Sequence, residues 1–65
     1  MKIEVNGASR AITATDIAGA LAELGWGEAR VATALNGTFV PAAARTTSML
    51  AEGDRIEVLT AMQGG

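Results

Sequence analysis

Two Asn-Gly pairs, Asn6-Gly7 and Asn36-Gly37, constrain the fold of this chain more than any other feature. A type I′ turn needs positive φ at both central positions, so each pair predicts a tight β-hairpin. Segments 1–5 and 31–35, which precede the pairs, alternate with the period of two that is typical of half-buried strands. Two hairpins are therefore expected, with return strands at 9–13, where Ile12 is the core residue, and at 38–40, where Pro41 ends the strand.

Between the hairpins, the apolar residues follow a helical period. Ile17, Leu21 and Leu24 recur at i, i+4 and i+7 and form one apolar stripe. Thr15 is expected to be the N-cap, because its hydroxyl can accept an early N–H of the helix. Asp16 then lies in the first turn, where a negative charge meets the positive end of the helix dipole.

The helix is expected to end at Gly25, since the C′ position favours a residue that tolerates positive φ. Trp26 would then occupy the C″ position and could pack on Leu21. A contact of Trp26 with a partner protein is an alternative that the sequence leaves open.

After the second hairpin, residues 42–50 show no clear period and are expected to form a connection, with a short helical turn at 48–50. A turn at 52–54 leads to a last strand at 55–61. The order strand, strand, helix, strand, strand, strand predicts an α+β fold, with a mixed sheet of about five strands and one main helix packed on one face. We expect a domain at 1–60 and a C-terminal tail at 61–65.

The inventory of side chains argues against an enzyme. A chain of 65 residues makes one small domain, too small to enclose both a core and a sizeable substrate pocket. It contains no Cys, His or Tyr, so it lacks an imidazole base for nucleophilic catalysis and the favoured ligands of zinc. We therefore expect no catalytic residue and no metal site.

Charge and hydropathy argue against two further classes. The five basic residues are scattered and the net charge is −2, so the basic footprint of a nucleic-acid-binding protein is not visible. No apolar run approaches the roughly 20 residues of a membrane span. No charged-then-apolar leader is recognisable, and a cytoplasmic location is the expectation.

Several motifs along the chain occur in an order that is typical of one family. The chain opens with Met1-Lys2-Ile3, closes its helix with Ala20-Leu21-Ala22-Glu23-Leu24-Gly25, and continues with Ala34-Leu35-Asn36-Gly37 and Val40-Pro41. It ends with Glu52-Gly53-Asp54-Arg55-Ile56-Glu57-Val58-Leu59-Thr60-Ala61-Met62-Gln63-Gly64-Gly65. Over its whole length it resembles the ThiS-type sulfur carriers of thiamine thiazole biosynthesis, which belong to the ubiquitin-like β-grasp superfamily. The Gly-Asp-Arg turn, the apolar strand and the Gln-Gly-Gly end are specific in combination.

The resemblance implies a carrier cycle that runs through the last residue. An E1-like adenylating enzyme uses ATP to convert the Gly65 carboxylate into an acyl-adenylate, because a carboxylate is a poor electrophile and AMP is a good leaving group. A persulfide on a sulfur donor then gives a terminal thiocarboxylate, and thiazole synthase takes its sulfur. In such a cycle the carrier supplies no catalytic side chain and binds no cofactor, since the activating partner uses the ATP.

The tail suits this role physically. Gly64 and Gly65 lack a Cβ and can pass a narrow constriction. Five residues after Thr60 span up to about 17 Å when they are extended. Met62, Gln63 and Gly64 are therefore expected to enter the partner's active site with Gly65.

One position departs from the family pattern. Members often carry a basic residue directly after the Val-Pro pair, whereas Ala42 follows Pro41 in this chain. This chain therefore has no side-chain charge at this position for a partner to contact.

Phe39, Leu59 and Ala61 are the predicted partner surface. Opposed residues of a hairpin share a face, so Leu35 and Phe39 belong to opposite faces of the second hairpin. If Leu35 faces the helix, Phe39 and Leu59 face solvent, and exposed apolar patches often mark binding sites. The inverted register, with Phe39 in the core, is the alternative.

Three other functions remain open on the sequence alone. A molybdopterin-synthase small subunit would share the fold and the Gly-Gly end, but would pass its sulfur to a pterin precursor. A ubiquitin-like protein modifier would also use the tail, although Lys2 is the only lysine for building chains. A plain β-grasp binding module would use no activated terminus.

Overall fold

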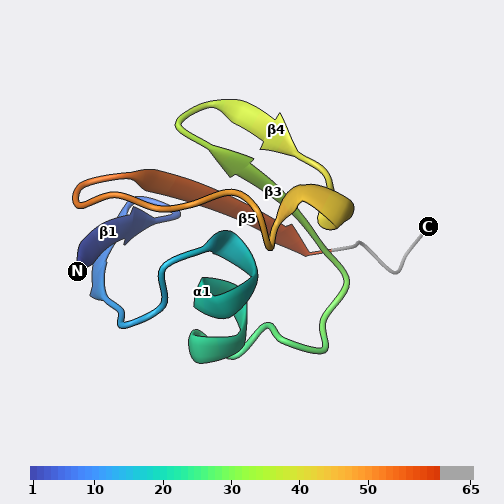
Figure 1. The fold of residues 1–65 in the computed structure, drawn as a ribbon, viewed down its shortest axis with the longest axis horizontal. Coiled ribbons are helices and arrows are strands. Elements are labelled where there is room, and N and C mark those ends of the chain that lie inside the picture. Colours follow the sequence, from blue (N-terminus) through green and yellow to red (C-terminus); the bar gives the residue numbers. More distant parts are fainter. Residues whose placement is uncertain (61–65) are drawn as a thin grey trace.

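A computed structural model describes residues 1–60 of the chain. The elements in chain order are β1 (Lys2–Val5), β2 (Ala8–Ala11), α1 (Ile17–Glu23), β3 (Val31–Leu35), β4 (Thr38–Val40), the 3₁₀ helix η1 (Ala42–Ala44) and β5 (Arg55–Thr60). The strands form one sheet in the order β2-β1-β5-β3-β4, in which β1 and β5 are parallel and the other neighbours are antiparallel. Helix α1 covers one face of this sheet (Figure 1). The predicted α+β architecture is confirmed.

Both Asn-Gly pairs form the turns that were predicted for them. Asn6 and Gly7 have φ values of 50° and 85°, and Asn36 and Gly37 have values of 50° and 86°. Positive φ at both central positions defines the type I′ turn, whose twist matches that of the flanking strands. Strand β5 lies between the two hairpins, in the centre of the sheet.

Helix α1 begins one residue later than the sequence predicts. Asp16, not Thr15, is the N-cap, and its Oδ1 accepts the N–H of Gly19 at 2.6 Å. The main chain of Thr15 is bound elsewhere, because its C=O accepts the N–H of Leu50 at 2.8 Å. The prediction of Thr15 was wrong because a contact with a distant segment decides which residue caps the helix.

The same distant segment satisfies two further N–H groups at the helix start. Ile17 donates to the C=O of Ser48 at 3.1 Å, and Ala18 donates to the C=O of Arg45 at 3.2 Å. The first turn of a helix leaves such donors without partners inside the helix. The connection between β4 and β5 therefore holds the start of α1 in place.

The end of α1 follows the prediction. The N–H of Trp26 donates to the C=O of Leu21 at 2.7 Å, and the N–H of Gly25 donates to the C=O of Ala22 at 3.2 Å. These two bonds define the Schellman motif, and Gly25 has the positive φ, 100°, that the motif requires. Trp26 is half-buried and packs against the core, which fits its role at C″.

The short helical turn in the connection lies at 42–44, not at 48–50 as predicted. Pro41 precedes it with φ of −67°, a value that its ring imposes, and the N–H of Ala44 donates to the C=O of Pro41 at 2.9 Å. Residues 48–50 instead run extended beside the start of α1, where Met49 forms an isolated antiparallel bridge with Asp16. Their main-chain groups are thus already committed to the helix start.

The core lies between α1 and the inner face of the sheet. Its buried apolar residues are Ile3, Val5, Ile12, Ile17, Ala20, Leu21, Val40, Leu50, Ile56 and Val58. Ile12 is buried as predicted, although it follows the end of β2. Within residues 1–60, the structure contains no helix with the length and apolarity needed to cross a membrane.

Candidate functional site: the outer face of the sheet

The face of the sheet opposite α1 carries the two most exposed large apolar side chains of the described residues. Ile56 and Val58 of β5 point into the core. Leu59, the next residue of the strand, is 70% exposed. Phe39 on β4 is 66% exposed, while Leu35 packs against the core. The register with Phe39 facing solvent is therefore confirmed, and the inverted register is excluded.

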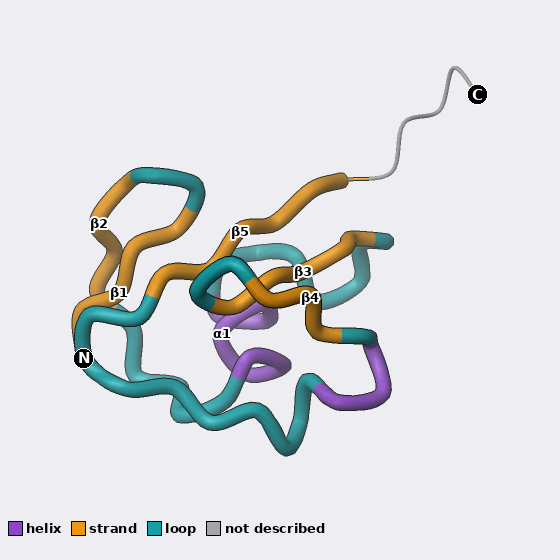
Figure 2. The backbone as a smooth tube through the Cα atoms, turned by 90° about the horizontal axis from the view of Figure 1, so that it is seen from above, coloured by secondary structure: helices purple, strands orange, loops and turns teal. Residues whose placement is uncertain are grey.

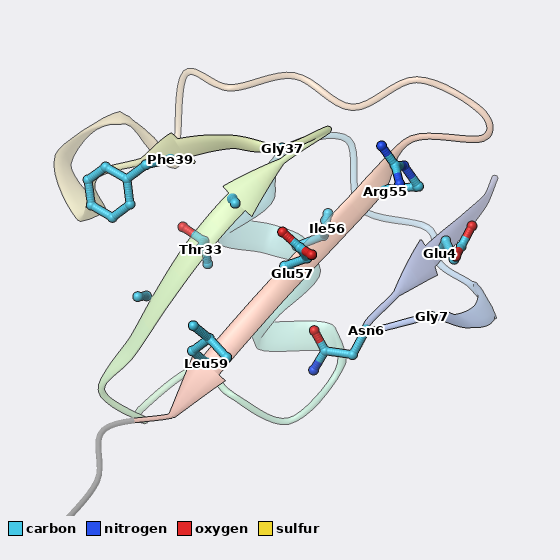
Figure 3. A pocket seen from close by; sticks show the side chains of 12 residues that line it. Glu4, Asn6, Gly7, Thr33, Gly37, Phe39, Arg55, Ile56, Glu57 and Leu59 are labelled. Atoms are coloured by element: carbon cyan, nitrogen blue, oxygen red, sulfur yellow. The ribbon is translucent and has the colours of Figure 1, made fainter.

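Small residues of β3 separate these two side chains and form the floor of a shallow trough. Ala34 lies opposite Phe39 on one side and opposite Glu57 on the other, and Ala32 lies opposite Leu59. Because an alanine side chain ends at Cβ, the taller side chains of β4 and β5 rise on both sides of β3. The resulting cavity has a volume of about 590 Å³ and is open to solvent (Figure 3).

The trough is apolar toward the tail and charged at its other end. Leu59 lies near the point where β5 leads into the tail, whereas Arg55 lies at the start of the strand, in register with Glu4 of β1 (Figure 3). Glu57 projects between these two ends. A surface of this kind suits a protein partner that presents apolar side chains next to polar ones.

The lining of the trough offers charged, polar and apolar groups for binding. Its lining combines carboxylates, a guanidinium, an amide and apolar side chains, and the part of the chain that the structure describes holds no cluster of three or more potential metal ligands. A shallow, open trough does not exclude water from a reacting group. Such a lining can bind a protein surface through apolar contacts and hydrogen bonds.

Asn6, which the sequence predicts only as a turn residue, also binds strand β5. Asn6 donates from Nδ2 to the C=O of Val58 at 3.1 Å and accepts the N–H of Val58 at Oδ1 at 2.8 Å. Its amide thus extends the pairing of β1 with β5 beyond the end of β1. The Asn-Gly pair signals the turn, but nothing in the sequence signals this second role.

The structure brings together Phe39 and Leu59 of the predicted site on one face. The other predicted site residues lie outside the described residues: Ala61, Met62, Gln63, Gly64 and Gly65. Thr60, the last residue of β5, lies opposite Val31 at the edge of the trough's apolar end. Strand β5 therefore ends directly beside the exposed apolar surface.

Comparisons with known proteins agree with this geometry. A family model described as the ThiS family matches residues 3–65. A solved structure, the crystal structure of a thiamine biosynthesis protein (ThiS) from Geobacter metallireducens, is 28% identical to this chain and superposes with a TM-score of 0.84. The match covers 100% of both chains, which confirms the predicted β-grasp fold. A search of curated proteins found no match.

Proposed function

This chain belongs to the ThiS family, and from this premise we propose that it is a sulfur carrier of thiamine biosynthesis that works through the carboxylate of Gly65. The family match and the solved ThiS structure support the carrier role. The observation that carries the proposal is the extent of the family match, which runs through the Gly64-Gly65 end of the chain. The domain at 1–60 then serves to deliver this end to partner enzymes.

In the first step, an oxygen of the Gly65 carboxylate attacks the α-phosphorus of ATP, and pyrophosphate leaves. The ATP is bound by an E1-like adenylating partner and not by this chain. The acyl-adenylate contains an activated carbonyl carbon, since AMP is a far better leaving group than oxide.

In the second step, a persulfide of the sulfur donor attacks this carbonyl carbon, and AMP leaves. The product is an acyl disulfide, and a thiol of the activating machinery reduces its S–S bond. The carrier is released as a thiocarboxylate while the thiol partner becomes a disulfide. Thiazole synthase then transfers the sulfur from Gly65 to its substrate, an oxygen from that substrate or from water takes the place of the sulfur, and the carboxylate is regenerated for another cycle in the cytoplasm.

The trough supplies the docking surface for these partners in our proposal. Phe39 and Leu59 are largely exposed apolar side chains, and neither belongs to the buried core. Exposed patches of this kind mark interaction sites more often than isolated exposed residues do. Because the tail begins at the same end of the sheet, a partner that covers Leu59 is close enough to accept the five residues that follow Thr60.

Three altered termini test the role of Gly65 directly. We expect ATP–pyrophosphate exchange by the cognate adenylating enzyme to be lost with Gly65→Leu, with one residue added after Gly65, and with a C-terminal carboxamide in place of the carboxylate. The carboxamide is the sharpest variant, because it changes one atom of the nucleophile and leaves the tail's width and length alone. Circular dichroism melting should be the same for all forms, and exchange that persists with the carboxamide would refute the proposal.

A further inference from the structure

The sheet is narrower where the tail leaves it than in its middle. Thr60, the last residue of β5, lies opposite Val31, the first residue of β3. Strand β4 ends two residues earlier in the register, with Val40 opposite Thr33, and β1 pairs with β5 only as far as Ile56. Figure 2 shows β5 running past the β1–β2 hairpin toward the tail. Among the described residues, the last rung of the sheet therefore consists of two strands, an arrangement that is marginal in water by itself.

The side chain of Arg45 occupies the place where β4 would continue. Its Nη2 donates to the C=O of Val31 at 2.5 Å, and its Nε donates to Oγ1 of Thr33 at 3.1 Å. The same Thr33 hydroxyl donates to the C=O of Val40 at 2.9 Å. The guanidinium thus continues the hydrogen bonding along the open side of β3, from the end of β4 to the rung that carries the tail.

Arg45 is itself held firmly on the side away from the sheet. Its C=O accepts the N–H of Ala18 in the first turn of α1, and its N–H donates to the C=O of Ala42. The side chain is half-buried, and Thr33, one of its partners, is only 2% exposed. Arg45 therefore connects the start of α1, through its main chain, to the end of β3, through its side chain.

The geometry requires arginine. The planar guanidinium presents two N–H groups in a fixed fork, so one side chain can bind both the Thr33 hydroxyl and the Val31 carbonyl. A lysine has one nitrogen on a flexible stem and cannot reproduce two separately placed nitrogen donors.

We propose that Arg45 is a positioning residue that fixes the end of β5 from which the tail starts. It holds Val31, and through the β3–β5 pairing it holds Thr60. This inference rests on the proposed function, in which a partner must receive the tail in extended form. A tail whose base is fixed loses less conformational freedom on binding, whereas the chemistry takes place in the partner and does not involve Arg45.

The kinetic test compares Arg45→Ala and Arg45→Lys with the unchanged protein in ATP–pyrophosphate exchange, at a temperature where circular dichroism shows all of them folded. We expect Arg45→Ala to raise KM for the carrier roughly fivefold and to change kcat less than about twofold, because only the ordering cost of binding increases. Arg45→Lys should restore part of the loss. Glu23→Ala is the matched control, since the Glu23 carboxylate binds Thr13 and Ala14 rather than the tail end of the sheet, and its KM should not change.

Amide hydrogen exchange by NMR provides a readout without any partner. Arg45→Ala should speed the exchange of Ala32 and Leu59, which face each other next to the last rung, and leave the Ala34–Glu57 pair near its original rate. An unchanged KM in folded Arg45→Ala protein would overturn the inference, as would an equal rise in KM with Glu23→Ala. If the unchanged protein supports no exchange at all, the proposed function fails, and the inference fails with it.

Discussion

The amide of Asn6 forms with Val58 both of the main-chain hydrogen bonds that a neighbouring strand residue would form. The main-chain N–H of Asn6 donates one step earlier to the C=O of Ile56 at 3.0 Å. One residue therefore shapes the turn of the first hairpin and also binds the central strand close to the tail. The position requires a residue that tolerates a φ of 50° and carries an amide, and asparagine meets both requirements.

Two substitutions at this position separate its two roles. Asn6→Gly keeps the left-handed backbone accessible and removes only the bonds to Val58, so we expect a loss of about 1–2 kcal/mol in the free energy of unfolding. Asn6→Ala adds the cost of positive φ for a residue with a Cβ, and should lose about 1 kcal/mol more. Urea denaturation measures both values. Equal stability of Asn6→Gly and the unchanged protein would show that the bonds to Val58 contribute nothing.

The exposed apolar surface predicts a separation of stability from binding. Leu59→Glu should change the free energy of unfolding by less than about 0.5 kcal/mol, because the side chain is largely in water. Its affinity for the adenylating enzyme should fall markedly, since a charge would be buried in the interface. Met49→Glu is the control, as Met49 is similarly exposed at 61% but lies in the connection before β5. A Leu59→Glu protein that unfolds, or that binds normally, would contradict the assignment of the trough.

Glu23 predicts how stability depends on pH. Its carboxylate accepts hydrogen bonds from the N–H of Thr13, which is the main cause of its lowered pKa, and from the N–H of Ala14 and the hydroxyl of Thr13. The unfolded chain therefore takes up this proton at a higher pH, near 4.5, than the folded chain does. The contribution of Glu23 is fully present above that pH and is lost as the pH falls through the lower folded pKa.

Glu23→Gln should remove this part of the pH dependence. Urea denaturation at neutral and at acidic pH should show that the unchanged protein is more stable than Glu23→Gln at neutral pH, and that the difference shrinks in acid. A difference that stays constant with pH would mean that the carboxylate charge is not what stabilises the segment between β2 and α1.

Two glycines after α1 make a matched pair for testing the Schellman motif. Gly25 has φ of 100°, and no atom lies within 4 Å of the position that a Cβ would take, so Gly25→Ala should cost about 1 kcal/mol from backbone strain alone. Gly27 lies outside the left-handed region, and a Cβ there would meet Ala22 at 3.4 Å, which is ordinary contact. Gly27→Ala should therefore be neutral or slightly stabilising. Thermal melts of the two variants that coincide would argue against strain at Gly25.

Local signals in the sequence predicted the features that depend on a few neighbouring residues. The two hairpin turns, the Schellman end of α1 and the placing of Leu35 and Phe39 on opposite faces all follow from short local patterns, whereas the sequence left open which of these two faces meets solvent. The errors arose where a distant segment competes with a local preference. Thr15 has a good capping side chain, but Leu50 binds its main chain, and the cap falls to Asp16.

The structural role of Arg45 was not predictable for the same reason. Its partners Val31 and Thr33 precede it by 14 and 12 residues and belong to a strand whose pairing the sequence suggests only in outline. Residues 42–50 show no period, so nothing local indicates which side chain of this connection turns toward the sheet. The second role of Asn6 is hidden in the same way, since Val58 is 52 residues away.

The mass of the protein isolated from its own cells tests the central claim most directly. We predict a chain that ends at Gly65, of which a fraction carries the mass gain of one sulfur in place of one oxygen, and fragmentation should place this gain on the last residue. A native chain that extends past Gly65 without being trimmed, or one whose terminus never carries sulfur while thiamine is being made, would contradict the account.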